Sequence, residues 1–419
     1  MLQSAKAERP GWIVSALCFL LVTGPPSFRA RTAEAALRGD VDLVVVLQAA
    51  VYFAAFVWSA RQLYLHSELR AFSWTHKVAA LLVGLIAVST FFSTAPLFTA
   101  YRAFQIAALF CFTTVFIKKF GVQTSLDRIR AGMLFLCLLL VIMAFLNPDQ
   151  VLFVSETGFP RLRGWTIAES GTVSAFAVIL LLCTPTARKR SWFWLSLSSG
   201  VLFFSLTRTA WISVFCVLLM IIVLRPQVWC RKVALIVLLA VLCTVMAVPA
   251  LRNVRDESDV GEIGGRQYFW WGMIYMVLSD SPWFGEGYEA GTRTLAQAVD
   301  PTGGGQGHSA FLEVLVGTGI VGSAALCLLL GNLIALCLRF VKRQADAQTF
   351  EVMALFAVVL IIGSTWERLD CTPFGFTFWA LVSIIPQMHL LKNQESAQRT
   401  SNKAIALSAS KMGCELPAQ

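Results

Sequence analysis

The sequence predicts an all-α integral membrane protein with about 12 transmembrane helices. Of its 419 residues, 57% are hydrophobic and only 14% are charged, and the mean hydropathy is +0.70. A soluble domain carries roughly 25% charged residues, so the composition excludes an ordinary soluble enzyme. The apolar residues also gather in long runs, as expected where helices of about 20 apolar residues cross a bilayer.

Twelve apolar runs predict the spans. They lie at residues 12–24, 42–60, 77–95, 98–118, 131–147, 172–186, 191–206, 209–224, 232–250, 309–338, 350–366 and 373–390. The first run follows Lys6 and Arg9 and so looks like a signal peptide, but no clean cleavage site follows and more spans come after it. We therefore expect an uncleaved first helix.

These runs divide the chain into four regions. Residues 1–250 hold the first nine spans, residues 251–308 form one long connection, and residues 309–390 hold the last three spans. Residues 391–419 form a basic tail that we expect to be disordered. Twelve spans place both termini on the same side of the membrane.

The cationic residues predict which side this is. Every lysine and half of the arginines, 22 of the 34 cationic residues, fall on the side of the termini, whereas the opposite side holds arginines only. Because cytoplasmic loops accumulate lysine and arginine, we expect both termini to lie in the cytoplasm. The same rule explains the net charge of +10 without a nucleic-acid partner.

The long outer connection contains an aromatic segment, "RQYFWWGMIYMVL" at residues 266–278. Tryptophan and tyrosine favour the level of the lipid headgroups. The segment therefore predicts a helix that lies along the membrane interface. Connections of this length are usually functional or disordered.

Arginines near the outer ends of the spans are candidate ligands of an anion. Arg208 lies in the tight turn "SLTRTAW", Arg102 near the start of a span, and Arg163 in "RLRGWT". Ionisable residues at the edge of the apolar zone are costly and often functional, and the guanidinium group binds phosphate oxygens in pairs. Each arginine could instead extend to the interface for purely structural reasons. Several arginines together on the outer side favour an anionic ligand. Arg161 and Arg293 are further candidates on this side.

The segment "GGGQGHSAFLEVLVGTGIVG" at 303–322 places His308 where a glycine-rich stretch meets an apolar helix. It is the only histidine expected on the outer side. A helix N-terminus favours the neutral imidazole, which can act as a general base, although a histidine bonded to a loop carbonyl is the structural alternative. Glu313, one turn inside the helix, is expected to pair with an arginine. A zinc site would need further ligands beside this histidine. The acidic run at 256–259 could bind a divalent cation, but it fits a solvated hinge better. We therefore expect neither a metal nor a cofactor.

Taken together, "GHSAFLEVLVGTGIVG", "SLTRTAWISV", "GGRQYFWWGM" and "PWFGEGYEAG" resemble the O-antigen ligase and O-antigen polymerase superfamily. Within this superfamily, the chain is most similar to an O-antigen ligase. It departs from the family pattern at Leu206–Arg208, where many members carry a serine before the arginine. The resemblance implies a GT-C-like glycosyltransferase of the bacterial inner membrane whose active site faces the periplasm.

The resemblance also implies the reaction and the site. Glycan would pass from undecaprenyl diphosphate to lipid A-core with inversion, with His308 as the base and Arg208 and Arg266 on the diphosphate. Arg163 and Arg102 occupy comparable positions. A polymerase or a protein O-oligosaccharyltransferase of the same superfamily is the nearest alternative, and a transporter of lipid-linked glycans is an alternative of another class. We expect a monomer or a weak dimer.

Overall fold

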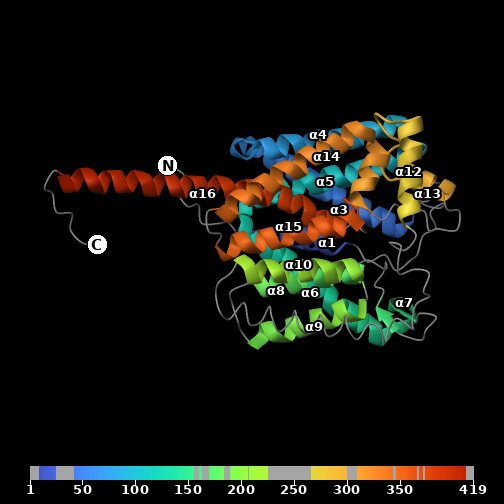
Figure 1. Cartoon of the computed structure of the whole chain (residues 1–419), viewed down its shortest axis with the longest axis horizontal. Helices are drawn as coiled ribbons and strands as arrows, with labels where there is room; N and C mark the ends of the chain where they lie inside the picture. Colours follow the sequence, from blue (N-terminus) through green and yellow to red (C-terminus); the bar gives the residue numbers. More distant parts are fainter. Residues whose placement is uncertain are drawn as a thin grey trace.

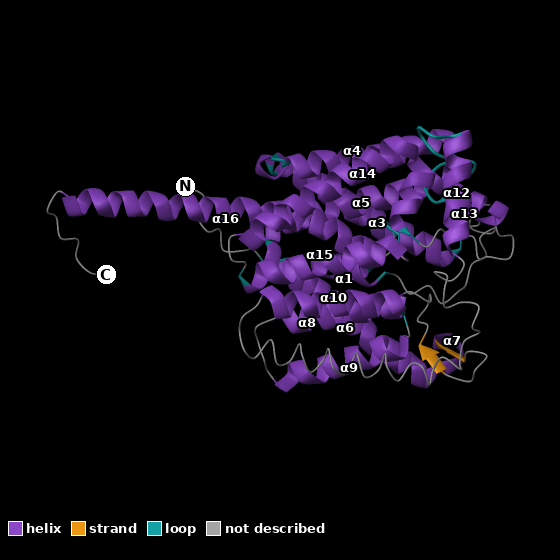
Figure 2. Ribbon diagram, viewed as in Figure 1, coloured by secondary structure: helices purple, strands orange, loops and turns teal. Residues whose placement is uncertain are grey.

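In a computed structural model, the chain forms a bundle of helices that lie side by side (Figure 1). The structure describes residues 9–24, 42–154, 160–162, 169–183, 189–205, 207–224, 266–299, 309–342, 346–365, 368–370 and 373–411. Almost all of this part is helical (Figure 2), which confirms the predicted all-α membrane fold.

Most of the bundle helices follow the predicted spans closely. The bundle helices are α1 (Trp12–Thr23), α3 (Leu43–Leu65), α4 (Trp74–Val88), α5 (Pro96–Phe120), α6 (Val122–Leu146), α8 (Glu169–Cys183), α9 (Lys189–Ser205), α10 (Arg208–Leu224), α14 (Ala310–Lys342), α15 (Ala347–Thr365) and α16 (Phe374–Lys411). Of these, α6 begins earlier and α16 ends later than predicted. Within the described residues, 7 helices are long and apolar enough to cross a membrane, and α1, α8, α9 and α10 are shorter apolar helices. The predicted span at 232–250 lies outside the described residues.

Smaller elements connect these helices. They are the 3₁₀ helices η1 (Ser67–Arg70) and η2 (Ser89–Phe92), the helices α7 (Pro148–Val151), α12 (Arg266–Asp280) and α13 (Ala290–Val299), and the strands β1 (Leu152–Val154) and β2 (Pro160–Leu162). The two strands pair antiparallel, a short ribbon that the sequence did not predict. Helix α12 covers the predicted interfacial segment and runs across the ends of the bundle helices (Figure 1).

The core forms where helices from both halves of the chain meet. Helix α5 packs against α3 and α16, α14 against α4, and α8 against α6, α9 and α15. Phe112 and Phe116 of α5, Phe176 of α8 and Trp379 of α16 are almost completely buried. Helices α3 and α6 keep large apolar side chains on their outer surface, as expected for faces that contact lipid.

The two ends of the bundle differ in the cationic residues they carry. At one end, α5, α10 and α14 begin and α15 finishes; we call it the arginine end because Arg102, Arg208, Arg293 and Arg368 lie there. At the other end, the lysine end, α5 finishes with Lys118 and Lys119. The structure thus reproduces the unequal division of lysine and arginine that the sequence predicts.

The C-terminal helix is longer than predicted. Helix α16 continues past residue 390 as far as Lys411, although we expected the tail from residue 391 to be disordered. It extends beyond the bundle (Figure 1). The sequence contains no glycine or proline between Pro386 and Gly413, so a helix nucleated inside the bundle can propagate outward at little cost.

Candidate functional site

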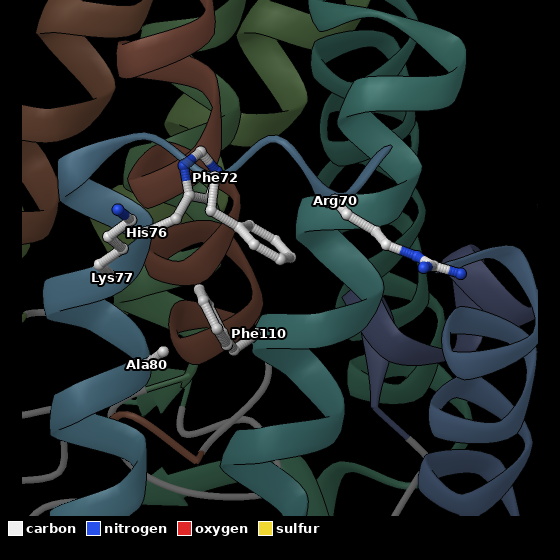
Figure 3. Close-up of a pocket in the computed structure, with 6 residues that line it drawn as sticks. All are labelled: Arg70, Phe72, His76, Lys77, Ala80 and Phe110. Carbon is white, nitrogen blue, oxygen red and sulfur yellow. The ribbon is translucent and has the colours of Figure 1, made fainter. Parts of the chain in front are cut away.

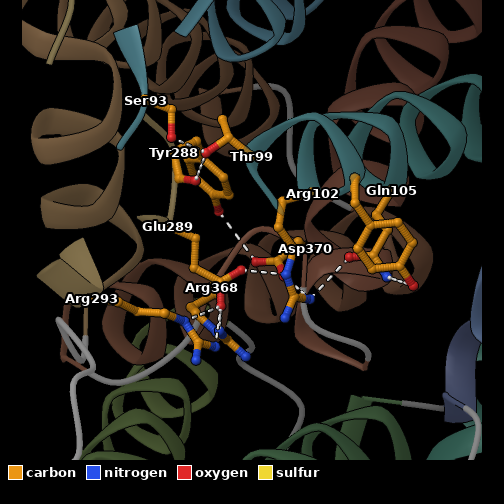
Figure 4. Close-up of polar contacts among 10 residues, drawn as sticks. Ser93, Thr99, Arg102, Gln105, Tyr288, Glu289, Arg293, Arg368 and Asp370 are labelled. Carbon is orange, nitrogen blue, oxygen red and sulfur yellow. Dashed lines mark hydrogen bonds and ion pairs between the residues drawn. The ribbon is translucent and has the colours of Figure 1, made fainter. Parts of the chain in front are cut away.

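A buried carboxylate gathers three arginines at the arginine end (Figure 4). Glu289 is only 1% exposed, and it forms ion pairs with Arg102, Arg293 and Arg368. Arg293 Nη2 donates to Glu289 Oε1 at 2.7 Å, and Arg368 Nη1 donates to the same oxygen. Arg102 Nε lies 2.6 Å from Glu289 Oε2, an ion pair without the direction of a hydrogen bond.

A second carboxylate completes what we call the arginine cluster, namely Arg102, Glu289, Arg293, Arg368 and Asp370. Arg102 Nη1 donates to Asp370 Oδ2 at 2.8 Å. The hydroxyl of Tyr288 donates to the other oxygen of Asp370 at 3.3 Å. Three guanidinium groups therefore face two carboxylates, and the five side chains carry one surplus positive charge.

The charges of the cluster keep its central carboxylate ionised. Burial by itself raises the pKa of Glu289, but the positive charges of Arg102, Arg368 and Arg293 outweigh burial and lower it to about 2. Burial and the neighbouring carboxylates raise the pKa of Tyr288 well above its usual value. Its hydroxyl therefore remains a hydrogen-bond donor to Asp370.

The connection between α12 and α13, residues 281–289, carries Glu289 into this position. It lies against α14 at a kink, where Gly319 has a φ of 65°. Glu286 N donates to Val316 O at 2.9 Å, and Ile320 N donates to Pro282 O at 2.8 Å. A side chain at position 319 would collide with the backbone of Trp283. The kink in α14 therefore supplies the backbone groups that hold this connection.

Glu289 itself has an unusual backbone. Its φ is 61°, and it is the one non-glycine residue with positive φ in the described part of the chain. This region of backbone space is unfavourable for a residue with a long side chain and is often found at functional sites. Because Tyr288 N donates to Ser89 Oγ at 3.1 Å and Thr99 Oγ1 donates to Tyr288 O at 3.2 Å, the neighbouring backbone is fixed on both sides.

Three of the predicted site residues lie at or beside this cluster. Arg102 is in the second turn of α5 and Arg293 is in α13, and both pair with Glu289. Glu313 is 1% exposed. In the part of the chain that the structure describes, it forms no ion pair, and its Oε2 accepts no hydrogen bond. The expected pairing with an arginine is therefore absent there, although the charges of Arg368 and Arg293 act on its carboxyl group.

The other predicted residues are placed less fully. Arg208 is the first residue of α10 and is exposed at the arginine end. Arg266 is the first residue of α12 and Arg161 lies in β2. For these two residues the structure describes the backbone and not the side chain. Arg163 and His308 lie outside the described residues.

Ser309, the residue after His308, directly precedes α14. Ser309 is buried, and its backbone carbonyl accepts from Glu313 N at 2.9 Å, as in the first turn of a helix. Helix α14 thus begins at the arginine end.

Sequence patterns missed Glu289 and Asp370 and gave Arg368 no special role. Glu289 follows a glycine-rich turn, "FGEGYE", where a carboxylate normally faces solvent. Its partners Arg102 and Arg368 come from distant segments, so no local spacing links them. The one available signal was the high frequency of arginine on this side.

A cavity of about 330 Å³ lies away from this cluster, at the lysine end (Figure 3). It is lined by Arg70, Phe72, His76, Lys77, Ala80 and Phe110. The guanidinium of Arg70 points toward α3, where it donates to Leu63 O at 2.7 Å. The cavity therefore does not open on the arginine cluster.

The acidic run at 256–259 lies outside the described residues. Within the described ranges, no group of three or more His, Cys, Asp and Glu side chains is arranged to hold a metal ion.

Comparison with known families adds an independent observation. Residues 193–327 match the family model described as O-antigen ligase. The matched segment runs from α9 into α14 and includes Arg208, Arg266, Glu289, Arg293 and His308. A comparison with curated proteins finds no match. The family match supports a membrane glycosyltransferase of the O-antigen ligase and polymerase family, and it confirms that this chain resembles the O-antigen ligase superfamily.

Proposed function

We propose that the protein is an inner-membrane glycosyltransferase of the O-antigen ligase type. It transfers O-antigen glycan from undecaprenyl diphosphate to lipid A-core at the periplasmic face, as a step in lipopolysaccharide assembly. The observation that carries this proposal is the family match across the segment that holds both His308 and Arg208, together with the position of Arg208 at the exposed start of α10.

The reaction needs only two kinds of group from the protein. An acceptor hydroxyl attacks the anomeric carbon of the donor sugar and loses its proton to His308, which acts as a general base. The bond from that carbon to the diphosphate breaks, and undecaprenyl diphosphate leaves with the electron pair. Arginines already in place stabilise the charge on the leaving group, and we assign this role to Arg208 and Arg266, with Arg163 and Arg102 as further candidates. Displacement in one step inverts the anomeric configuration. It requires neither ATP nor a metal ion.

A transporter of lipid-linked glycans is the alternative of a different class. Transporters hold their substrate near the middle of the membrane, often between broken helices. Arg208 instead begins α10, and α14 begins at Ala310, two residues after His308 in the sequence. Placement at one end of the bundle supports an enzyme that acts at one membrane face.

Substitution of His308 and Arg208 tests the proposal. We expect His308→Ala to abolish glycan transfer in a reconstituted assay with a lipid-linked glycan and rough lipopolysaccharide, while the protein still inserts in the membrane. Arg208→Ala should reduce transfer by roughly 100-fold, the scale seen when one stabilising donor is lost. The matched controls are His66→Ala and Arg339→Ala, because both residues are solvent-accessible and lie toward the lysine end. Wild-type transfer by His308→Ala would refute the proposal.

The same assay separates the members of the superfamily. A ligase adds glycan to the lipopolysaccharide and produces a ladder on lipid A-core. A polymerase extends the lipid-linked glycan and leaves the lipopolysaccharide unchanged, and a protein O-oligosaccharyltransferase requires a protein acceptor. A ladder confined to undecaprenyl diphosphate would replace the ligase assignment with a polymerase.

A further inference from the structure

We propose that Glu289 is a positioning residue, which fixes the 281–289 connection on the bundle and thereby sets the relative positions of α12, which begins at Arg266, and α14, which begins two residues after His308. The proposal rests on the function proposed above, because these two residues are assigned to the diphosphate and to the acceptor hydroxyl. Glu289 itself contacts neither substrate in this scheme.

The first support is the way in which Glu289 joins separate parts of the chain. Arg293 pairs with it from α13, Arg102 from α5, and Arg368 from the connection between α15 and α16 (Figure 4). One carboxylate therefore anchors three segments. If its charge is removed, the three guanidinium groups lose the carboxylate that they share, and their mutual repulsion favours separation.

The second support is the place of the 281–289 connection in the chain. It follows α12, which begins at Arg266, and the same polypeptide continues through α13 to His308 and α14. The connection is also bonded to the kink of α14, through Gly287 N to Gly317 O at 3.1 Å as well as the bonds described above. A displacement of Glu289 is thus transmitted to α12 on one side and to α14 on the other.

The third support is the backbone at Glu289. Its φ of 61° would suit glycine, asparagine or aspartate better than glutamate. A glutamate held in this conformation needs stabilisation from its side chain, and the ion pairs provide it. The side chain and the local backbone conformation therefore depend on each other.

The test compares Glu289→Gln with Glu289→Asp and with a matched control. Gln keeps the size of the side chain and removes its charge, whereas Asp keeps the charge and tolerates positive φ. The control is Glu351→Gln, since Glu351 is also buried, at 3% exposure, and pairs with Arg130 at 2.5 Å at the lysine end. All variants are the full chain in lipid nanodiscs.

Two measurements are made on each variant. Hydrogen exchange should become faster in residues 281–289 and at the start of α14 in Glu289→Gln, and should remain as in the wild type there in Glu351→Gln. The kcat per folded molecule should fall roughly 10- to 100-fold in Glu289→Gln, the scale of a small misplacement of reacting groups. Glu289→Asp should recover part of this loss, and Glu351→Gln should keep the kcat of the wild type.

The outcomes separate the two proposals. Unchanged exchange and unchanged kcat in Glu289→Gln would overturn the positioning role, even if His308→Ala abolishes transfer and the proposed function stands. If Glu351→Gln loses as much kcat as Glu289→Gln, Glu289 has only a structural role. If His308→Ala retains transfer, the proposed function fails, and the exchange measurement still decides whether Glu289 holds the connection in place. Should Glu289→Gln fail to fold, Glu289→Asp must show the same exchange pattern to a smaller degree for the positioning role to stand.

Discussion

At the scale of single residues, the arginine cluster joins cations beside the apolar spans to carboxylates from short connections. Arg102 and Arg293 stand out because a charge beside an apolar run is costly. Glu289 and Asp370 lie in short connections, where carboxylates are common and usually solvated. Their importance comes from burial and from pairing with distant segments, and neither property leaves a pattern in the local sequence.

The depressed pKa of Glu289 leads to a prediction about acid stability. A carboxyl group with a pKa of about 2 in the folded protein, against an ordinary value of 4.5, stabilises the folded state above its ordinary pKa, and this contribution is lost as the pH falls through that range. We therefore expect Glu289→Gln to unfold at a lower temperature than the wild type at neutral pH. The difference in Tm should narrow as the pH is lowered from 4.5 toward 2, as measured by thermal unfolding in nanodiscs.

An exposed carboxylate provides the comparison for this measurement. Asp127 pairs with Arg130 at 2.8 Å, but its side chain is 53% exposed. Exposed pairs contribute little, so Asp127→Asn should change Tm only slightly at any pH. A difference in Tm between wild type and Glu289→Gln that stays constant down to the lowest pH would show that the charge of Glu289 does not stabilise the fold.

At the scale of helices, most of the predicted spans that the structure describes agree with it to within several residues at each end, but α6 begins at Val122 and not at 131, and α16 ends at Lys411 and not at 390. Their apolar runs are long, and the helix ends carry recognisable residues, such as Pro96 at the start of α5 and Gly121 after its end. The kink in α14 was not predicted, because "VGTGIVG" at 316–322 also fits a helix that packs closely on its neighbour. Only the approach of the 281–289 connection explains the positive φ of Gly319.

We expect Gly319→Ala to destabilise the protein by about 1–3 kcal/mol, because a side chain is strained at positive φ and would collide with Trp283. Transfer should fall as well, since the 281–289 connection loses its place on α14. The control is Gly331→Ala in the same helix, where an added methyl group meets nothing within 4 Å. That change should be neutral or slightly stabilising, because alanine favours helix. Equal unfolding temperatures of the two variants would contradict the role assigned to the kink.

At the scale of the whole molecule, the bundle and the outer part of α16 are separable. The last side-chain contacts described for α16 with the bundle come from Lys392, which lies 3.4 Å from Asp346 and 5.8 Å from the ring centre of Phe340. The described side chains from Gln394 to Asn402 are exposed. The length of α16 therefore reflects helix propensity and not packing.

Truncation tests this separation. A chain that ends at Glu395 should retain the wild-type Tm and the full rate of transfer, because it keeps Lys392. A chain that ends at Ile385 loses Met388, which is 3% exposed, and should be less stable by about 2–5 kcal/mol. Loss of transfer in the longer truncated chain, with Tm unchanged, would show that the outer part of α16 has a function of its own.

The unequal division of lysine and arginine between the two ends leads to a prediction about orientation. Because cationic residues accumulate on the cytoplasmic side and every lysine is predicted on one side, the lysine end should face the cytoplasm. The arginine end should then face the periplasm, as the proposed reaction requires.

Single cysteines can report the orientation of the protein after the native cysteines are replaced by serine or alanine. Asp280→Cys at the exposed end of α12 should react with a membrane-impermeant maleimide in intact spheroplasts. Glu68→Cys, whose native side chain is 71% exposed at the lysine end, should react only after the membrane is permeabilised. The reverse pattern would place the arginine cluster in the cytoplasm, where the periplasmic glycan acceptor could not reach it, and would exclude the proposed ligase reaction.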